Sequence, residues 1–167
     1  MARPVTLATG QFGDLNLEDL CVLAEKMSYE GLELACHAHF DVTKALDDDT
    51  YIPYVKNTLA AHGLHCYAIS AHLTGQCVGD QWDFRLDNFA PEKYAGQPEA
   101  IRNWAIEEMK NTARAAKKLG VDVVTCFTGS PIWAYWYAYP QTTEEMVEKG
   151  FQEIYDLWTP IFDVFDE

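Results

Sequence analysis

Side chains that can do chemistry lie within the segment GLELACHAHFDV (Gly31–Val42), which begins as the second apolar run of the sequence. Glu33 lies between two leucines, and His37 and His39 come where the segment ends. A lone buried carboxylate is unfavourable, so Glu33 needs either a partner or a place in a polar pocket. Two histidines at this spacing place both rings on one side of an extended chain, where they suit a metal or a ligand hydroxyl. The segment therefore predicts binding residues at the end of a buried strand.

Two further segments carry candidate binding residues. His72 follows the apolar run LHCYAIS, where a satisfied core histidine is the alternative reading. The turn FTGSPIW offers Thr128, Ser130 and backbone amides to hydroxyls or a phosphate, but it lacks the glycines and lysine of a phosphate loop. Trp133 opens an aromatic run that suits either a pocket for sugar rings or a protein interface. The other aromatic residues of this run are Tyr135, Trp136, Tyr137 and Tyr139.

The elements that must position these residues alternate between strands and helices. Short apolar runs typical of buried parallel strands are found at Pro4–Gly10, Leu32–Cys36, Leu64–Ser70 and Val121–Gly129. Capping residues and helical spacing predict helices after Asn16, over about Thr50–His62, over Ile101–Leu119 and after Thr143. We expect Gly75–Pro98 to be a long functional loop, and Pro160 to kink or divide the last helix.

Side-chain size along the strands indicates which parallel fold these units form. Small or polar residues share one parity: Thr6, Ala8, Gly10, Glu33, Ala35, His37, Cys66, Ala68, Ser70, His72, Val124, Cys126 and Thr128. Large apolar residues share the other: Val5, Leu7, Leu32, Leu34, Tyr67, Ile69, Val123 and Phe127. Val124 fits this division least well, because it is a bulky residue on the small parity. A sheet covered by helices on both faces needs bulky residues on both, whereas a barrel turns one face to a confined interior.

The expected fold is therefore α/β, a parallel (βα)4 half of a TIM (βα)8 barrel. Closing such a barrel takes eight strands and about 200 residues or more. We expect residues 1–167 to form a single domain that this chain alone does not close. Because open strand edges pair with other chains, we expect a homo-oligomer or a complex with a complementary C-terminal half-barrel.

Composition excludes several classes of partner. The formal net charge is −14, which repels phosphate backbones and argues against nucleic-acid binding. No apolar run approaches the roughly 18–20 residues needed to span a bilayer, so we expect no membrane association. The five cysteines are scattered and odd in number, which favours free thiols and a cytoplasmic setting.

The ordered strand ends resemble one known family. TGQF, GLELACHAHFDV, AISAHLTGQ and CFTGSPIW, with the helix segments EEMKNTARAAKKLGVDVV and PIFDVFDE, are similar to the sugar phosphate isomerase/epimerase group of xylose isomerase-like TIM barrels. The resemblance implies a carbohydrate substrate, a divalent metal ion and proton transfer next to a carbonyl. In that family the metal ligands and two catalytic glutamates come from the second half of the barrel, so the resemblance assigns neither to this chain.

We therefore expect the chain to supply a pocket wall and to be inactive alone. The expected substrate-binding residues are Glu33, His37, His39, His72, Thr128, Ser130 and Trp133, with no metal ligand and no identified catalytic base. Two alternatives stay open. One is a non-enzymatic α/β module that binds a small molecule or a protein. The other is a metal-dependent hydrolase that uses the His37/His39 pair.

Overall fold

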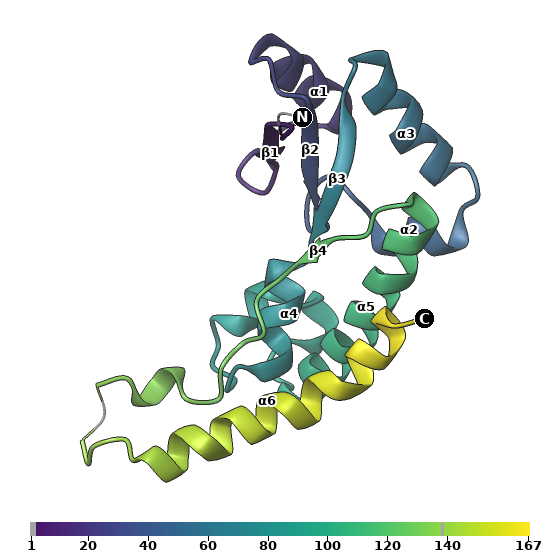
Figure 1. Cartoon of the computed structure of the whole chain (residues 1–167). Helices are drawn as coiled ribbons and strands as arrows, with labels where there is room; N and C mark the ends of the chain where they lie inside the picture. The colour runs from purple at the N-terminus through teal and green to yellow at the C-terminus, as the bar shows by residue number, and fades with distance from the viewer. Residues whose placement is uncertain (1–2, 138) are drawn as a thin grey trace. The chain divides into compact units, whose positions relative to one another are not determined.

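The computed structural model describes residues 3–137 and 139–167 (Figure 1). The strands are β1 (Thr6–Ala8), β2 (Gly31–Ala35), β3 (His65–Ser70) and β4 (Val124–Thr125). The α-helices are α1 (Leu17–Lys26), α2 (Val42–Asp47), α3 (Tyr51–Ala61), α4 (His72–Gly79), α5 (Pro98–Leu119) and α6 (Glu144–Phe165). The 3₁₀ turns are η1 (Leu86–Phe89), η2 (Glu92–Tyr94) and η3 (Trp133–Tyr135).

These elements form two compact units. Unit 1 contains the residues up to Ala71 together with Asn111–Thr125, and unit 2 contains His72–Lys110 and Cys126–Glu167. The helix α5 contributes its first part to unit 2 and its last part to unit 1. The expectation of one domain stays a prediction, because compact units of this kind occur both within one domain and as separate domains.

Unit 1 contains the whole sheet. Its four strands are parallel in the order β1-β2-β3-β4, as alternating βα units predict, and within the described residues the sheet does not close into a barrel. Ala8, Glu33 and Ala68 form one row across the first three strands. Ala35, Ser70 and Thr125 form the next row of the same face across β2, β3 and β4. This face carries small and polar side chains.

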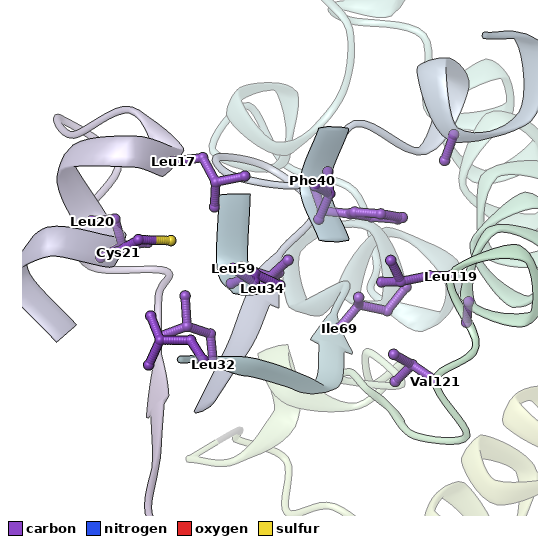
Figure 2. Close-up of a cluster of buried hydrophobic side chains, with 14 of the residues drawn as sticks. Leu17, Leu20, Cys21, Leu32, Leu34, Phe40, Leu59, Ile69, Leu119 and Val121 are labelled. Atoms are coloured by element: carbon purple, nitrogen blue, oxygen red, sulfur yellow. The ribbon is translucent and has the colours of Figure 1, made fainter. Parts of the chain in front are cut away.

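The opposite face carries the core of unit 1. Leu34 pairs with Ile69 and Ile69 pairs with Val124, so large apolar side chains align there. Helices α1 and α3 and the last turns of α5 add apolar residues to the same cluster (Figure 2). One apolar face against helices and one small, polar face agree with the barrel expectation.

The strand pairing corrects two of the parity assignments, one of them through a β-bulge. Leu32 pairs with Cys66 but Glu33 pairs with Ala68, which leaves Tyr67 as an extra residue of β3. The bulge places Cys66 on the apolar face rather than the small one. Gly31 is required beneath Tyr67, since a Cβ there would lie 2.4 Å from the Tyr67 ring. Val124 is also on the apolar face, through its pairing with Ile69, which removes the misfit expected for strand four.

Helix boundaries follow the capping pattern closely. The Asn16 side chain accepts the Asp19 amide at 2.8 Å, and Thr143 accepts the Met146 amide at 3.3 Å. Gly63 follows α3 in the left-handed region, with φ of 66°. Of the two outcomes expected at Pro160, division of the helix is wrong, because α6 runs from Glu144 to Phe165 as one helix; a kink there stays a prediction.

Unit 2 departs most from expectation, because part of the expected loop is the helix α4. This helix packs directly on the backbone that follows β4: a Cβ on Gly75 would lie 2.2 Å from the Phe127 carbonyl oxygen, and one on Gly79 would lie 2.5 Å from that of Thr128. Strand β4 has two residues, Val124 and Thr125, so the expected strand Val121–Gly129 is too long. Within the described residues, no helix is both long and apolar enough to cross a bilayer.

Candidate functional site

The small face of the sheet in unit 1 holds the acid that the sequence singles out. Glu33 lies in the middle of β2 and is half-buried. Its Oε1 accepts a hydrogen bond from the Thr125 hydroxyl of β4 at 3.0 Å. Ala68 and Ser70 of the intervening strand β3 are small enough to let this contact pass above them. The partner that a carboxylate needs in a strand is therefore a threonine hydroxyl rather than an arginine.

His39 lies on the inner side of the turn after β2. The side chain is buried, with Nδ1 3.1 Å from the Thr9 hydroxyl oxygen and Nε2 3.1 Å from the Phe12 carbonyl oxygen. Burial lowers the pKa of His39 below its usual value of 6.5, although hydrogen bonds to the Leu15 and Phe12 carbonyls oppose this. Because both ring nitrogens are engaged by the protein, we leave His39 out of the proposed ligand contacts.

His37 lies on the outer side of the same turn. The amides of residues 38, 39 and 40 all point at the Ala35 carbonyl oxygen, at 2.8–3.1 Å, so the chain curls immediately after β2. The expected extended HxH geometry is therefore wrong, since a turn sends the two rings in different directions. The exposed His37 ring reaches the Gly10 carbonyl oxygen, with Nε2 at 3.4 Å. It remains available for a ligand at the end of β2.

In unit 2, His72 begins α4 instead of ending a strand. Its half-buried ring meets the Phe127 ring edge to face, with centroids 4.7 Å apart. Thr128 donates its hydroxyl hydrogen to the Gly129 carbonyl at 2.8 Å, and the Trp158 indole donates to the Thr128 carbonyl at 3.0 Å. These contacts fix the path of the segment between β4 and α6.

The turn at Ser130 is held by an acid of α4's C-terminal end. Asp80 Oδ1 accepts the Ser130 amide at 2.6 Å, and Oδ2 accepts the Gln76 side-chain amide at 2.8 Å. Arg102 donates to the Asp80 carbonyl oxygen at 3.3 Å and pairs with Glu153 at 3.5 Å. Asp80 therefore links α4, the Ser130 turn and α5 within unit 2.

A cavity of about 530 Å³ lies beside this acid. Its lining combines polar side chains with two aromatic rings: Gln76, Asp80, Gln81, Asp83, Arg85, Leu86, Phe89, Trp133 and Ala134. The size is within the range of small-molecule sites, about 300–1,000 Å³. Trp133 is 64% exposed and lines this cavity.

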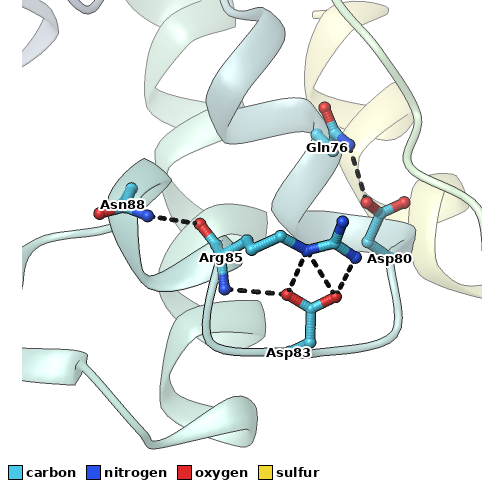
Figure 3. A network of polar contacts seen from close by, with 5 residues as sticks. All are labelled: Gln76, Asp80, Asp83, Arg85 and Asn88. Atoms are coloured by element: carbon cyan, nitrogen blue, oxygen red, sulfur yellow. Dashed lines mark hydrogen bonds and ion pairs between the residues drawn. The ribbon is translucent and has the colours of Figure 1, made fainter.

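The charged residues of the cavity neutralise one another in part. Arg85 donates through Nε to Asp83 Oδ1 at 2.9 Å, and its backbone amide donates to the same oxygen at 2.8 Å (Figure 3). The hydrogen bonds from Arg85 lower the pKa of the Asp83 carboxyl to about 2. Asp83 is therefore ionised near neutral pH, and the Arg85 guanidinium is already engaged.

Sequence reasoning identified only part of these two arrangements. It placed Glu33 and Trp133 but missed Thr125, Thr9, Asp80 and the Asp83–Arg85 pair. The segment GDQWDFR carries a usable signal for the Asp83–Arg85 pair, because these two residues have opposite charges and lie two positions apart. Asp80 had no such signal, since its role depends on the unpredicted helix α4.

The described residues do not supply a metal site. Among residues 3–137 and 139–167, no three His, Cys, Asp or Glu side chains converge closely enough to hold a metal ion. Because the resemblance places the metal ligands in the second half of the barrel, the divalent metal of the family stays a prediction. We assign no step to a metal held by this chain.

Comparison with known proteins agrees with the sheet architecture. A family model described as a xylose isomerase-like TIM barrel matches residues 21–167. The chain belongs to this family. The family includes sugar isomerases and epimerases, and its barrel explains both the parallel strands and the single helical layer on the apolar face of unit 1. No curated protein matches the chain.

Proposed function

We propose that the chain supplies the substrate-facing wall of a sugar isomerase or epimerase barrel of the xylose isomerase-like family. The reaction removes a proton from a carbon next to a carbonyl and returns it elsewhere on the sugar. Glu33 contacts substrate hydroxyls from the small face of β2, and His37 contacts them from the turn that follows this strand. The base that moves the proton lies on strands that complete the barrel, supplied by another segment or another chain.

The small, polar face of the sheet carries this proposal. A carboxylate and a hydroxyl 3.0 Å apart occupy it, and its neighbours Thr6 and Ala8 are exposed. A face that served only to pack another layer would carry bulky apolar residues, as the opposite face does. In a barrel the same small face turns to the interior, where polar groups near the strand ends bind substrate.

The test restores a barrel around the chain. The 167-residue protein is mixed with the C-terminal half of a characterised xylose isomerase-like enzyme, and assembly is checked by sedimentation. Aldoses and ketoses are then incubated in D₂O, and loss of the proton next to the carbonyl is followed by NMR. We expect exchange from the assembled barrel and none from either half alone.

Two variants make the test specific. Glu33→Gln keeps the shape of the side chain but removes its charge, so we expect kcat/KM to fall by about tenfold or more, the loss of one charge-assisted hydrogen bond. Glu25→Gln makes the same change on the exposed surface of α1 and should leave the rate within about twofold. An assembled barrel without exchange on any of these sugars would contradict the proposal.

A further inference from the structure

We infer that the cavity of unit 2 binds a neutral, unphosphorylated monosaccharide, stacked on Trp133. The inference goes beyond the proposed function, because the residues of that function lie in unit 1 and the cavity is lined by residues of unit 2. The binding itself rests on the cavity alone. All of its lining residues belong to unit 2.

The aromatic side of the cavity suits a sugar ring. Trp133 and Phe89 both line it, and the indole of Trp133 is 64% exposed. The electron-rich face of an aromatic ring attracts the weakly positive C–H groups on the apolar face of a sugar. The turn that carries Trp133 is braced, because the Thr142 hydroxyl donates to the Tyr135 carbonyl at 2.5 Å and Gln81 donates to the Tyr135 hydroxyl at 3.2 Å.

The polar side of the cavity suits hydroxyl groups. A carboxylate has about four acceptor positions, and Asp80 uses one on each oxygen for Ser130 and Gln76. The remaining positions can accept sugar hydroxyl hydrogens. Gln76 and Gln81 add amide groups that both donate and accept. Neighbouring hydroxyls of a sugar, each a donor and an acceptor, match this mixed set.

The charges of the cavity disfavour a phosphate. Its charged lining residues are Asp80, Asp83 and Arg85, two carboxylates against one guanidinium, so their sum is −1. Arg85, the one cation among them, is already held by Asp83. The chain as a whole carries −14, which adds to the repulsion. A phosphate site instead needs free cations or free backbone amides.

The backbone turn at Ser130 is already occupied by a side chain of the protein. The Ser130 amide, which the sequence offers to a phosphate, donates to Asp80 at 2.6 Å. The Asp80 carboxylate thus takes the position that a bound anion would take. A phosphorylated sugar would have to displace it and would still face Asp83.

Tryptophan indole signals give a direct test of binding. The chain has five tryptophans, so the ¹⁵N-labelled 167-residue protein is expected to show one indole N–H signal for each in a two-dimensional NMR spectrum. Trp133→Phe assigns the signal of interest. A panel of aldoses and ketoses is titrated in, together with the corresponding sugar phosphates at equal concentration. We expect neutral sugars to shift the Trp133 signal in a saturable manner, and phosphates to bind about tenfold more weakly or worse.

Three variants sharpen the result. Trp133→Ala should abolish binding, whereas Trp136→Ala should not, because Trp136 is 75% exposed but does not line the cavity. Asp83→Asn removes a carboxylate and releases Arg85. The ratio of the Kd for sugar phosphates to the Kd for neutral sugars should therefore fall by about threefold or more. The side chains of Asp83 and Arg85 are 43% and 79% exposed. The other indole signals report whether the variant is folded.

The outcomes separate this inference from the proposed function. Equal or tighter binding of sugar phosphates, no shift at Trp133, or full binding by Trp133→Ala would overturn the inference. Saturable binding at Trp133 without deuterium exchange in the reassembled barrel would leave the inference standing and would count against the isomerase function. Deuterium exchange in the reassembled barrel without a shift of the Trp133 signal would overturn the inference and would leave the isomerase function standing.

Discussion

The two units bury and expose different kinds of side chain. Unit 1 places aliphatic residues between one sheet face and its helices, and eighteen buried residues form a single apolar cluster. Unit 2 exposes most of the large aromatic residues of the described chain. Those more than half exposed in unit 2 are Phe84, Phe127, Trp133, Trp136, Tyr137, Tyr139, Phe151, Tyr155 and Phe162.

This difference separates the residues that stabilise the fold from the residues that contact other molecules. A closed aliphatic cluster gives unit 1 its stability and leaves its second sheet face small and polar. In unit 2, close backbone contacts at glycines and side-chain hydrogen bonds fix the shape, and many aromatic rings remain uncovered. Exposed aromatic groups in this number mark contact surfaces. The following predictions test this contrast.

The largest loss of stability is expected in the core of unit 1. Leu34 is fully buried on the apolar face of β2. Leu34→Ala should lower the free energy of unfolding by about 2–5 kcal/mol, because it removes apolar burial and leaves a cavity. Amide hydrogen exchange should show a greater loss of protection in β2 and β3 than in α6. Val22→Ala, on the exposed side of α1, should change stability by less than about 0.5 kcal/mol.

The corresponding weak point of unit 2 is a glycine. Gly129 has φ of 70°, and a Cβ there would lie 2.4 Å from the Gln76 carbonyl oxygen. Gly129→Ala should cost about 1–3 kcal/mol for the backbone strain alone, and exchange should rise first in α4. Gly96→Ala is the matched control, because Gly96 has φ of 72° but nothing within 4 Å of its Cβ position. If the two variants lose equal stability, the close contact at Gly129 does not matter.

A pH dependence should arise from unit 1. Burial lowers the pKa of His39 in the folded chain, so below the unfolded value of 6.5 the unfolded state binds more protons. Stability from this group is therefore complete above pH 6.5 and is lost as the pH falls below it. The slope cannot exceed about 1.4 kcal/mol per pH unit for one group. Urea unfolding between pH 8 and pH 5 measures it.

Substitutions at the two histidines identify the source of this slope. His39→Gln should flatten it, at the cost of lower stability at pH 8. His37→Gln leaves the buried ring in place and should retain the slope. A slope that survives in His39→Gln would show that another group is responsible.

The smallest effect is expected from the polar face of the sheet. Thr125→Val removes the hydroxyl that donates to Glu33 and should cost about 0.5–1.5 kcal/mol, the usual net value of one hydrogen bond. Thr6→Val makes the same change at an exposed position of this face and serves as the control. In the Glu33→Gln background, Thr125→Val should lower the free energy of unfolding by less than it does in the unmodified chain. Thermal unfolding of the single and double variants measures both losses. Equal losses in the two backgrounds would show that the pair is not coupled.

Periodicity in the sequence was enough to predict most of unit 1. The parallel strands, the cap at Asn16 and the end of α3 before Gly63 all depend on local patterns, as does the cap at Thr143 in unit 2. The bulge at Tyr67 could not be predicted, because an extra residue in a strand shifts the side-chain parity without changing composition. The parity of Val124 was wrong, because Val124 pairs with Ile69 on the apolar face.

The candidate site was harder to predict than the sheet. Glycines 75 and 79 read as loop residues, whereas the structure uses them to let α4 approach the backbone after β4. Without α4, neither Asp80 nor the cavity that it lines could be placed. The burial of His39 could not be predicted. It depends on a turn around the Ala35 carbonyl, and no residue type nearby indicates such a turn.

The central claim is that the small face of unit 1's sheet faces the interior of a barrel. Methyl NMR with a water-soluble paramagnetic reagent tests it on the chain alone and on the chain assembled with a complementary half-barrel. We predict that the exposed Ala8 methyl is broadened in the chain alone and becomes shielded on assembly, while the Val22 methyls on α1 stay accessible. Shielding of Val22 with Ala8 left accessible would contradict the claim.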